Sequence, residues 1–262
     1  MAPVLQSHLP RSLWSDPALA RLPGIQPLDR DNWLQVDDAF SGQMALRDQM
    51  IAENPDKVMM LNPMAQEAAS ELLGYILKAL ALNSDYAISE AEVTRPDGVT
   101  VSIDRADPLA TAGRLVQEDL CLLQKLGDEH VLSSAVLCFP AGWTLAEKFM
   151  RPLIGIHEPV PGYDDNIARR VQRMFDAIRV EQPLWRANVL FYEDPTLFAP
   201  HFEHAPRPTT ANDAAFVRSE RQSLLRLENS QAVVFSIHTY VVRRVDLSQQ
   251  QLSSIAKLAE NG

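Results

Sequence analysis

Three segments in the last third of the sequence constrain the fold most, because each has the length and residue content of a β-strand. They are residues 186–193, 216–227 and 232–242. An apolar strand is also expected at 131–139, followed by two helical segments near 143–150 and 163–180. This order of one strand, helices and three strands is typical of an α+β domain in which helices pack on one face of an antiparallel sheet.

The N-terminal part of the chain is expected to add an arm and further helices to this core. Residues 1–27 contain five prolines and no sustained periodicity, which predicts an extended arm over the surface. Residues 28–262 are then expected to form a single domain. Its last helix is expected at about 247–260.

Two pairs of residues that end in proline mark expected helix starts. An Asn-Pro pair at 62–63 supplies an N-cap and a first helical position, and apolar residues follow at helical spacing. An Asp-Pro pair at 107–108 predicts a second helix that runs towards Gly127. Between the two helices, residues 86–104 suggest a hairpin with a Pro-Asp-Gly turn.

The charge of the chain limits its partners. The formal net charge is -10 and the sequence pI is about 5.1, which argues against a general nucleic-acid binder with clustered Lys and Arg. No apolar run approaches the roughly 18 residues of a membrane span, and no basic stretch precedes an apolar signal core. We therefore expect a cytoplasmic protein that binds neither nucleic acid nor a membrane.

The two cysteines, Cys121 and Cys138, are flanked by apolar residues and are expected to be reduced core thiols. The sequence contains no four-cysteine spacing typical of an iron–sulfur cluster. It also contains neither a Gly-rich dinucleotide-binding loop nor a phosphate-binding loop. If the chain takes part in redox chemistry, its reductase is expected to be a separate protein.

Among the six histidines, His157 stands beside the most rigid backbone. It follows an apolar Leu-Ile-Gly-Ile run and precedes Glu-Pro-Val-Pro-Gly-Tyr. Two prolines in three residues fix the backbone and remove two amide donors, so a neighbouring histidine is well placed to project into a pocket. The alternative is a hydrogen-bonded histidine in the core.

The other histidines have weaker signals. His238 lies within a predicted strand, where it would be functional if its face of the sheet lined a cavity and a satisfied sheet residue otherwise. We expect His130 to be solvated at a helix-to-strand junction. His201 and His204 lie close together, but a zinc site needs three or four ligands and no matching pair lies nearby.

The predicted strand at 216–227 carries an unusual density of charge. Strand alternation places Arg218 and Glu220 on one face and Arg221 on the other. Burying so many charges without partners would be costly. This pattern indicates either a solvated face with an internal ion-pair network or a polar wall beside a bound ligand, which Arg186 and Asn188 of the neighbouring strand would extend.

Several segments, in the right order over about residues 27–245, together resemble the haem-dependent oxidative N-demethylase family. The segments are 27–29 (PLD), 33–34 (WL), 116–120 (VQEDL), 139–140 (FP) with Trp143, 146–148 (AEK), 156–163 (IHEPVPGY), 186–188 (RAN), 218–224 (RSERQSL) and 226–227 (RL). No single motif suffices, but the ordered set is fairly specific.

The resemblance implies a PAS-like antiparallel sheet that binds haem b and has become an enzyme. It implies a monooxygenase that uses O2 to oxidise a small secondary amine, such as dimethylamine, to formaldehyde and a primary amine. Electrons would come from NADPH through a separate flavin and iron–sulfur subunit. This agrees with the absence of reductase motifs from the chain.

The resemblance also implies roles for individual residues. His157 would be the axial ligand of the haem iron, and Glu220 would hold the substrate ammonium and accept its proton. Tyr163 would line the pocket. Three arginines would contact haem propionates or polarise iron-bound oxygen, in an order that the sequence does not assign: Arg186, Arg218 and Arg221.

The chain departs from the family pattern at two positions. Val189 stands where a tryptophan is expected, and His238 stands in the strand position of an expected arginine, so we place His238 among the haem-pocket residues. Two other functions stay open at this point. One is a non-catalytic haem-binding PAS sensor, and the other is a haem-free PAS-like interaction protein.

Overall fold

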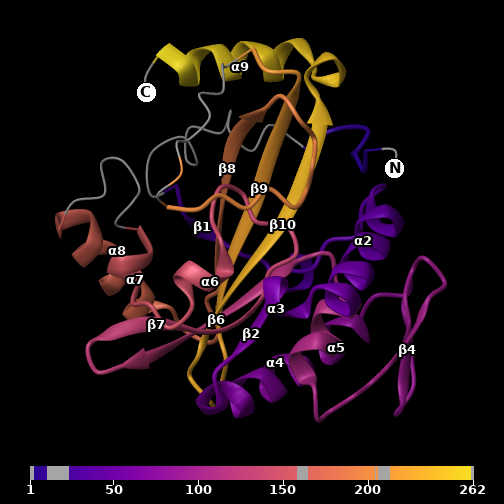
Figure 1. Cartoon of the computed structure of the whole chain (residues 1–262), viewed down its shortest axis with the longest axis vertical. Helices are drawn as coiled ribbons and strands as arrows, with labels where there is room; N and C mark the ends of the chain where they lie inside the picture. The colour runs from indigo at the N-terminus through magenta and orange to yellow at the C-terminus, as the bar shows by residue number, and fades with distance from the viewer. Residues whose placement is uncertain (1–2, 11–23, 158–164, 204, 206–212, 261–262) are drawn as a thin grey trace.

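A computed structural model describes residues 3–10, 24–157, 165–203, 205 and 213–260. Its centre is a seven-stranded antiparallel sheet in the order β1-β8-β9-β10-β6-β7-β2 (Figure 1). The strands are β1 (Gln26–Pro27), β2 (Met59–Leu61), β6 (Asp119–Leu126), β7 (Glu129–Val136), β8 (Leu184–Tyr192), β9 (Phe216–Arg226) and β10 (Val233–Arg243). A small second sheet contains β3 (Ala87–Ile88), β4 (Glu92–Thr94) and β5 (Thr100–Ser102).

The strands expected at 131–139, 186–193, 216–227 and 232–242 are confirmed as β7, β8, β9 and β10. Strands β9 and β10 pair along their whole length, with Glu220 opposite Thr239 and Arg221 opposite His238. Strand β8 pairs with β9 and places Asn188 opposite Glu220. The long paired strands hold their side chains in a fixed order on each face of the sheet.

The helices lie before, between and after these strands. They are α2 (Phe40–Glu53), α3 (Pro55–Val58), α4 (Gln66–Leu80), α5 (Pro108–Leu115), α6 (Leu145–Lys148), α7 (Leu153–His157), α8 (Asp165–Ala177) and α9 (Gln249–Glu260). The expected cap at Asn62 is confirmed, since its side chain accepts a hydrogen bond from the backbone of Met64 at 3.1 Å. The hairpin is also confirmed, because Arg95 and Val99 are hydrogen-bonded across its turn.

The prediction that the helix beginning at 107–108 runs towards Gly127 is wrong in the length of the helix. Helix α5 ends at Leu115, and Asp119–Leu126 forms strand β6. The first five residues of β6 are buried on both faces. A short apolar run of this kind lacks the alternation that distinguishes a strand from a buried helix.

Helices cover both faces of the sheet, so the expectation that they pack on one face is wrong. Leu120 and Leu122 of β6 belong to a core formed with α2, α4 and α5. Cys121 and Leu123 belong to a second core formed with α6, α7 and α8. Because successive residues of a strand point to opposite faces, the two cores lie on opposite sides of the sheet.

We name the two faces by the β9 and β10 residues that they carry. The Glu220 face carries Arg218, Glu220 and Leu224, and the second core with α6, α7 and α8 lies on it. The His238 face carries Arg221 and His238, which are paired with each other across the strands. This division decides which of the expected site residues lie together.

Part of the N-terminal arm is built into the sheet. Strand β6 pairs with β10 only as far as Ile237, and beyond that point Gln6 exchanges hydrogen bonds of 2.9 and 2.7 Å with the backbone of Val241. Residues 11–23 of the expected arm lie outside the described residues. Among the described residues, no helix combines the length and apolar character that crossing a bilayer requires.

Candidate functional site

The carboxylate of Glu220 is held by side chains of two neighbouring strands. Arg218 donates to Oε1 at 3.2 Å, while Asn188 and Gln222 donate to Oε2 at 2.9 and 3.0 Å. Asn188 also accepts a hydrogen bond from the backbone N–H of Glu220 at 2.9 Å, which fixes the two strands in register at this point. The result is a buried carboxylate in a defined orientation on the Glu220 face.

Arg218 is occupied by this arrangement. Its guanidinium donates to the carbonyl of Leu197 at 3.0 Å and to the carbonyl of Phe139, in addition to Glu220. It also lies over the ring of Tyr192, 6.0 Å from the centroid. Arg218 therefore positions Glu220 and neutralises its charge, while its buried Nε has no partner among the described residues.

Arg186 lies on the same face and has no side-chain or backbone partner among the described residues. Strand alternation from Asn188 places it on the Glu220 face, opposite Gln222. Burial lowers the pKa of Arg186, and the charge of Glu220 opposes that change. Within the described part of the chain, its guanidinium makes no hydrogen bond or ion pair, and its Nε is buried.

Helix α7, which ends at His157, packs on the Glu220 face through Leu153. The amine of Lys148 donates to the carbonyl of Ile156 at 2.6 Å and forms an ion pair with Glu203. This contact fixes the last turn of α7 to α6 and to the segment after β8. The His157 side chain and all of Tyr163 lie outside the described residues, so their expected roles stay predictions.

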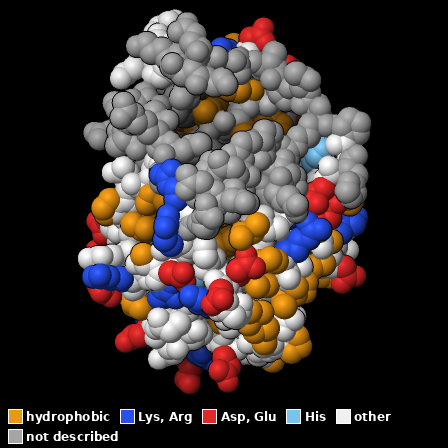
Figure 2. Space-filling model, turned by 90° about the vertical axis from the view of Figure 1, so that its left-hand side faces the viewer, with side chains coloured by type: hydrophobic (Ala, Val, Ile, Leu, Met, Phe, Trp, Pro, Cys, Tyr) orange, Lys and Arg blue, Asp and Glu red, His pale blue; other side chains and the backbone are white. Residues whose placement is uncertain are grey.

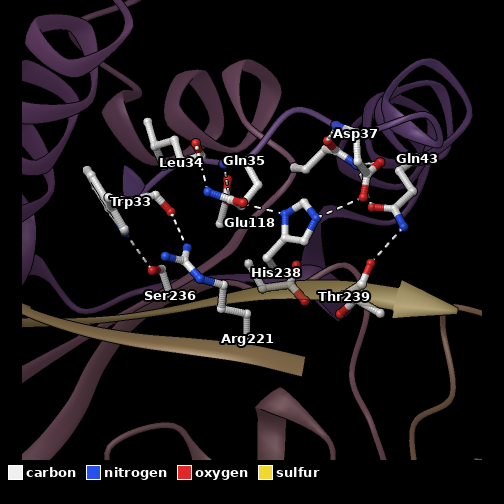
Figure 3. Close-up of polar contacts among 12 residues, drawn as sticks. Trp33, Leu34, Gln35, Asp37, Gln43, Glu118, Arg221, Ser236, His238 and Thr239 are labelled. Carbon is white, nitrogen blue, oxygen red and sulfur yellow. Dashed lines mark hydrogen bonds and ion pairs between the residues drawn. The ribbon is translucent and has the colours of Figure 1, made fainter. Parts of the chain in front are cut away.

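On the opposite face, His238 lies between two carboxylates (Figure 3). Its Nδ1 is 3.1 Å from Glu118 Oε1 and its Nε2 is 3.0 Å from Asp37 Oδ2. Burial alone would lower the pKa of His238, but hydrogen bonds and charges from Asp37 and Glu118 outweigh burial and raise it to about 9. His238 is thus a buried cation at neutral pH.

The same network lowers the pKa of Asp37. Burial would raise that pKa, but the hydrogen bond and charge of His238, with help from Gln117 and Gln6, hold it at about 2. Figure 3 also shows Gln43, whose amide donates to the carbonyl of Thr239 at 3.0 Å. The network ties the arm and α2 to β10.

Arg221 has its own partners on the His238 face. It donates to the carbonyls of Trp33 and Asn32 at 2.9 and 2.6 Å, and lies 5.3 Å from the ring centroid of Trp185. The structure therefore brings together Arg186, Arg218 and Glu220, but places Arg221 and His238 on the other side of the sheet. Sequence reasoning missed Asp37 as a partner of His238, because no local pattern signals a contact between residues 201 positions apart.

The expectation that His130 is solvated is wrong. It is buried, contacts the ring of Phe175 and is hydrogen-bonded to Gln172 at 2.9 Å, and burial lowers its pKa. His201 is within 3.0 Å of the carbonyl of Ala205, and His204 lies outside the described residues. The described residues contain no group of three or more ligand side chains that could hold a metal ion.

Figure 2 shows the side of the molecule on which α7, α8 and the β8 edge lie in Figure 1. Hydrophobic side chains are visible in its upper part. A cavity of about 250 Å³ elsewhere is lined by arm residues and by Asp37, Asp38 and Tyr240, so it adjoins the His238 network rather than Glu220.

The sequence of the chain matches the model of a known protein family. The model of the family described as haem-dependent oxidative N-demethylase, alpha subunit-like, matches residues 24–261 of the chain. The match includes β8, β9 and β10 with all the side chains that hold Glu220, together with α7. The chain belongs to the haem-dependent oxidative N-demethylase alpha subunit-like family.

Proposed function

We propose that this protein is a haem-binding, PAS-like monooxygenase subunit that oxidatively N-demethylates a small secondary amine. The observation that carries the proposal is the Glu220 carboxylate, which is buried, oriented by three side chains and placed on the face against which α7 packs. A buried carboxylate of this kind is suited to an ammonium group, and a gas sensor has no need of one.

The residues of the Glu220 face fit haem b in their chemistry. The buried Nε atoms of Arg186 and Arg218 lack partners among the described residues, and haem carries two carboxylates that could use such donors. His157, at the end of α7, would hold the haem through its imidazole. When bound, the haem would supply the activation of O2 and the two-electron oxidation of the amine.

Glu220 would bind the substrate and manage its proton. The carboxylate would hold the protonated amine by a charge-assisted hydrogen bond and accept one proton before oxidation. The overall reaction would convert dimethylamine, O2, two electrons and two protons into methylamine, formaldehyde and water. Arg218, Asn188 and Gln222 would keep the carboxylate oriented throughout.

The electrons would come from another protein. The family description names an alpha subunit, which implies a complex with at least one further subunit. We propose that this partner is a reductase with flavin and iron–sulfur centres that passes electrons from NADPH. The two reduced core cysteines of this chain are buried and cannot replace such a centre.

An absorption spectrum of the protein expressed with a haem precursor tests the cofactor. We expect a Soret band in the wild type and its loss in His157→Ala. A band of the same intensity in His157→Ala would exclude His157 as the ligand, and the absence of a band from the wild type after haem addition would refute the function.

Formaldehyde release from dimethylamine, with the reductase supplied, tests the reaction. Glu220→Gln should retain the Soret band but raise the dissociation constant for the amine at least tenfold, because the neutral amide loses the charge-assisted contact. Asp194→Asn, an exposed carboxyl substitution, is the control that should leave amine binding unchanged. A sensor would bind haem without releasing formaldehyde.

A further inference from the structure

Arg186 carries a charge that the described structure does not balance. Its side chain is half-buried, its Nε is inaccessible to solvent, and no hydrogen-bond acceptor reaches it within the described residues. Burial lowers its pKa, which means that the surroundings oppose its charge more than Glu220 supports it. A partly buried guanidinium without a partner lowers the stability of the folded protein unless a ligand supplies the missing hydrogen-bond acceptors.

The other arginines of β8 and β9 have protein partners. Arg218 is paired with Glu220 and with two carbonyl groups. Arg221 donates to two carbonyls of the segment before α2, and Arg226 donates to three carbonyls near α8 and the β9–β10 turn. Arg186 differs from all three, although it lies opposite Gln222 at the end of the same row of polar residues.

The nearest carboxylate cannot serve as the missing partner. Glu220 already receives hydrogen bonds from Arg218, Asn188 and Gln222, and it forms no ion pair with Arg186. Arg218 and Glu220 balance each other's charge, and no described carboxylate forms an ion pair with Arg186. A planar guanidinium with free donors matches a carboxylate, because it can bind both carboxylate oxygens at once.

We propose that Arg186 forms a carboxylate-binding site beside Glu220. The carboxylate comes either from a haem propionate or from the substrate itself, which would then be an N-methyl amino acid with its ammonium on Glu220 and its carboxylate on Arg186. The second source deepens the proposed function by changing the substrate class from a simple amine to a zwitterion. The second source rests on the proposed function of Glu220, whereas the site itself rests on the position of Arg186 and on its lack of a partner among the described residues.

The stability of the ligand-free protein distinguishes a ligand site from a structural residue. Arg186→Gln should leave the urea midpoint unchanged or raise it, because the substitution removes a half-buried charge without breaking a described contact. Arg243→Gln, an exposed arginine on β10, is the matched control. A lower midpoint for Arg186→Gln alone would assign Arg186 a structural role and overturn the proposal.

Haem titration tests the first source. If the carboxylate belongs to haem, Arg186→Gln should raise the dissociation constant for haem at least tenfold, and Arg243→Gln should not change it. If haem binds both variants equally, calorimetric titration with N-methylglycine and with dimethylamine tests the second source. Arg186→Gln should then weaken N-methylglycine binding at least tenfold and leave dimethylamine binding unchanged.

The two proposals can fail separately. If the wild type does not bind haem, the proposed function fails, but N-methylglycine binding to the haem-free chain that depends on Arg186 would still support the site. If Arg186→Gln alters neither haem binding nor N-methylglycine binding, the carboxylate site is refuted while the function at Glu220 stands.

Discussion

Replacing His238 with glutamine should change both the stability of the protein and its dependence on pH. His238 is 1% exposed and its imidazolium is the cation between Glu118 and Asp37. Removing one partner from a buried charged cluster typically costs about 3–5 kcal/mol, so we expect a loss of that size at pH 6.5. The remaining carboxylates would be left with only neutral donors.

The pH dependence follows from the raised pKa of His238. Because the folded-state pKa is about 9 and the ordinary value is 6.5, the stabilisation is fully present below pH 6.5 and is lost as the pH rises towards 9. The loss between pH 6.5 and 8.5 is roughly 2 kcal/mol by this linkage. In the His238→Gln variant, this part of the pH dependence should disappear.

Urea unfolding at intervals between pH 6.5 and 8.5 measures both effects. Burial lowers the pKa of His130, so the contribution of His130 to the free energy of unfolding changes with pH below this window. Burial raises the pKa of the Cys121 and Cys138 thiols, so their contributions change mainly above it. His8→Gln, at an exposed histidine, is the control. If wild type and His238→Gln lose the same free energy of unfolding across the window, His238 is not the buried cation.

Two further substitutions test contacts that hold the fold and the end of α7. Arg47→Met should lower the free energy of unfolding in urea by about 3–5 kcal/mol, because it leaves the buried Asp119 without the guanidinium that lies 2.6 Å from it. A loss below about 1 kcal/mol would contradict this reasoning. Lys148→Met should weaken haem binding severalfold, because it removes the hydrogen bond to the carbonyl of Ile156, the residue before His157. The control Arg151→Met, at an exposed residue, should leave haem binding unchanged. Equal haem affinities of Lys148→Met and the wild type would show that other contacts hold α7.

A strand could be predicted from the sequence where apolar and polar residues alternate, or where a short apolar run is bounded by turn residues. Helix α2 was not placed from the sequence, because its buried side includes Gln43 and Arg47 as well as Met44 and Ile51 and therefore lacks an apolar stripe. The partners that make this burial possible, Thr239, Gly113 and Asp119 among them, are 66 or more positions away. Tertiary contacts of this kind override the local pattern.

The candidate site, too, could be predicted only in part, because its contacts join residues that are far apart in the sequence. Alternation alone separated Glu220 from Arg221, but it could not show that Arg218 is neutralised by Glu220 while Arg186 has no partner among the described residues. That distinction depends on the carbonyls of Leu197 and Phe139, which reach Arg218 from other parts of the chain.

The two departures from the family pattern have a common location in the structure. Val189 packs with Val217 and Tyr240 on the His238 face, and His238 lies on that face by definition. Neither departure changes a side chain that holds Glu220. His238 as a buried cation places a positive charge between Asp37 and Glu118. The departures therefore lie where the arm and α2 contact the sheet, and the Glu220 face keeps the residues on which the proposed chemistry depends.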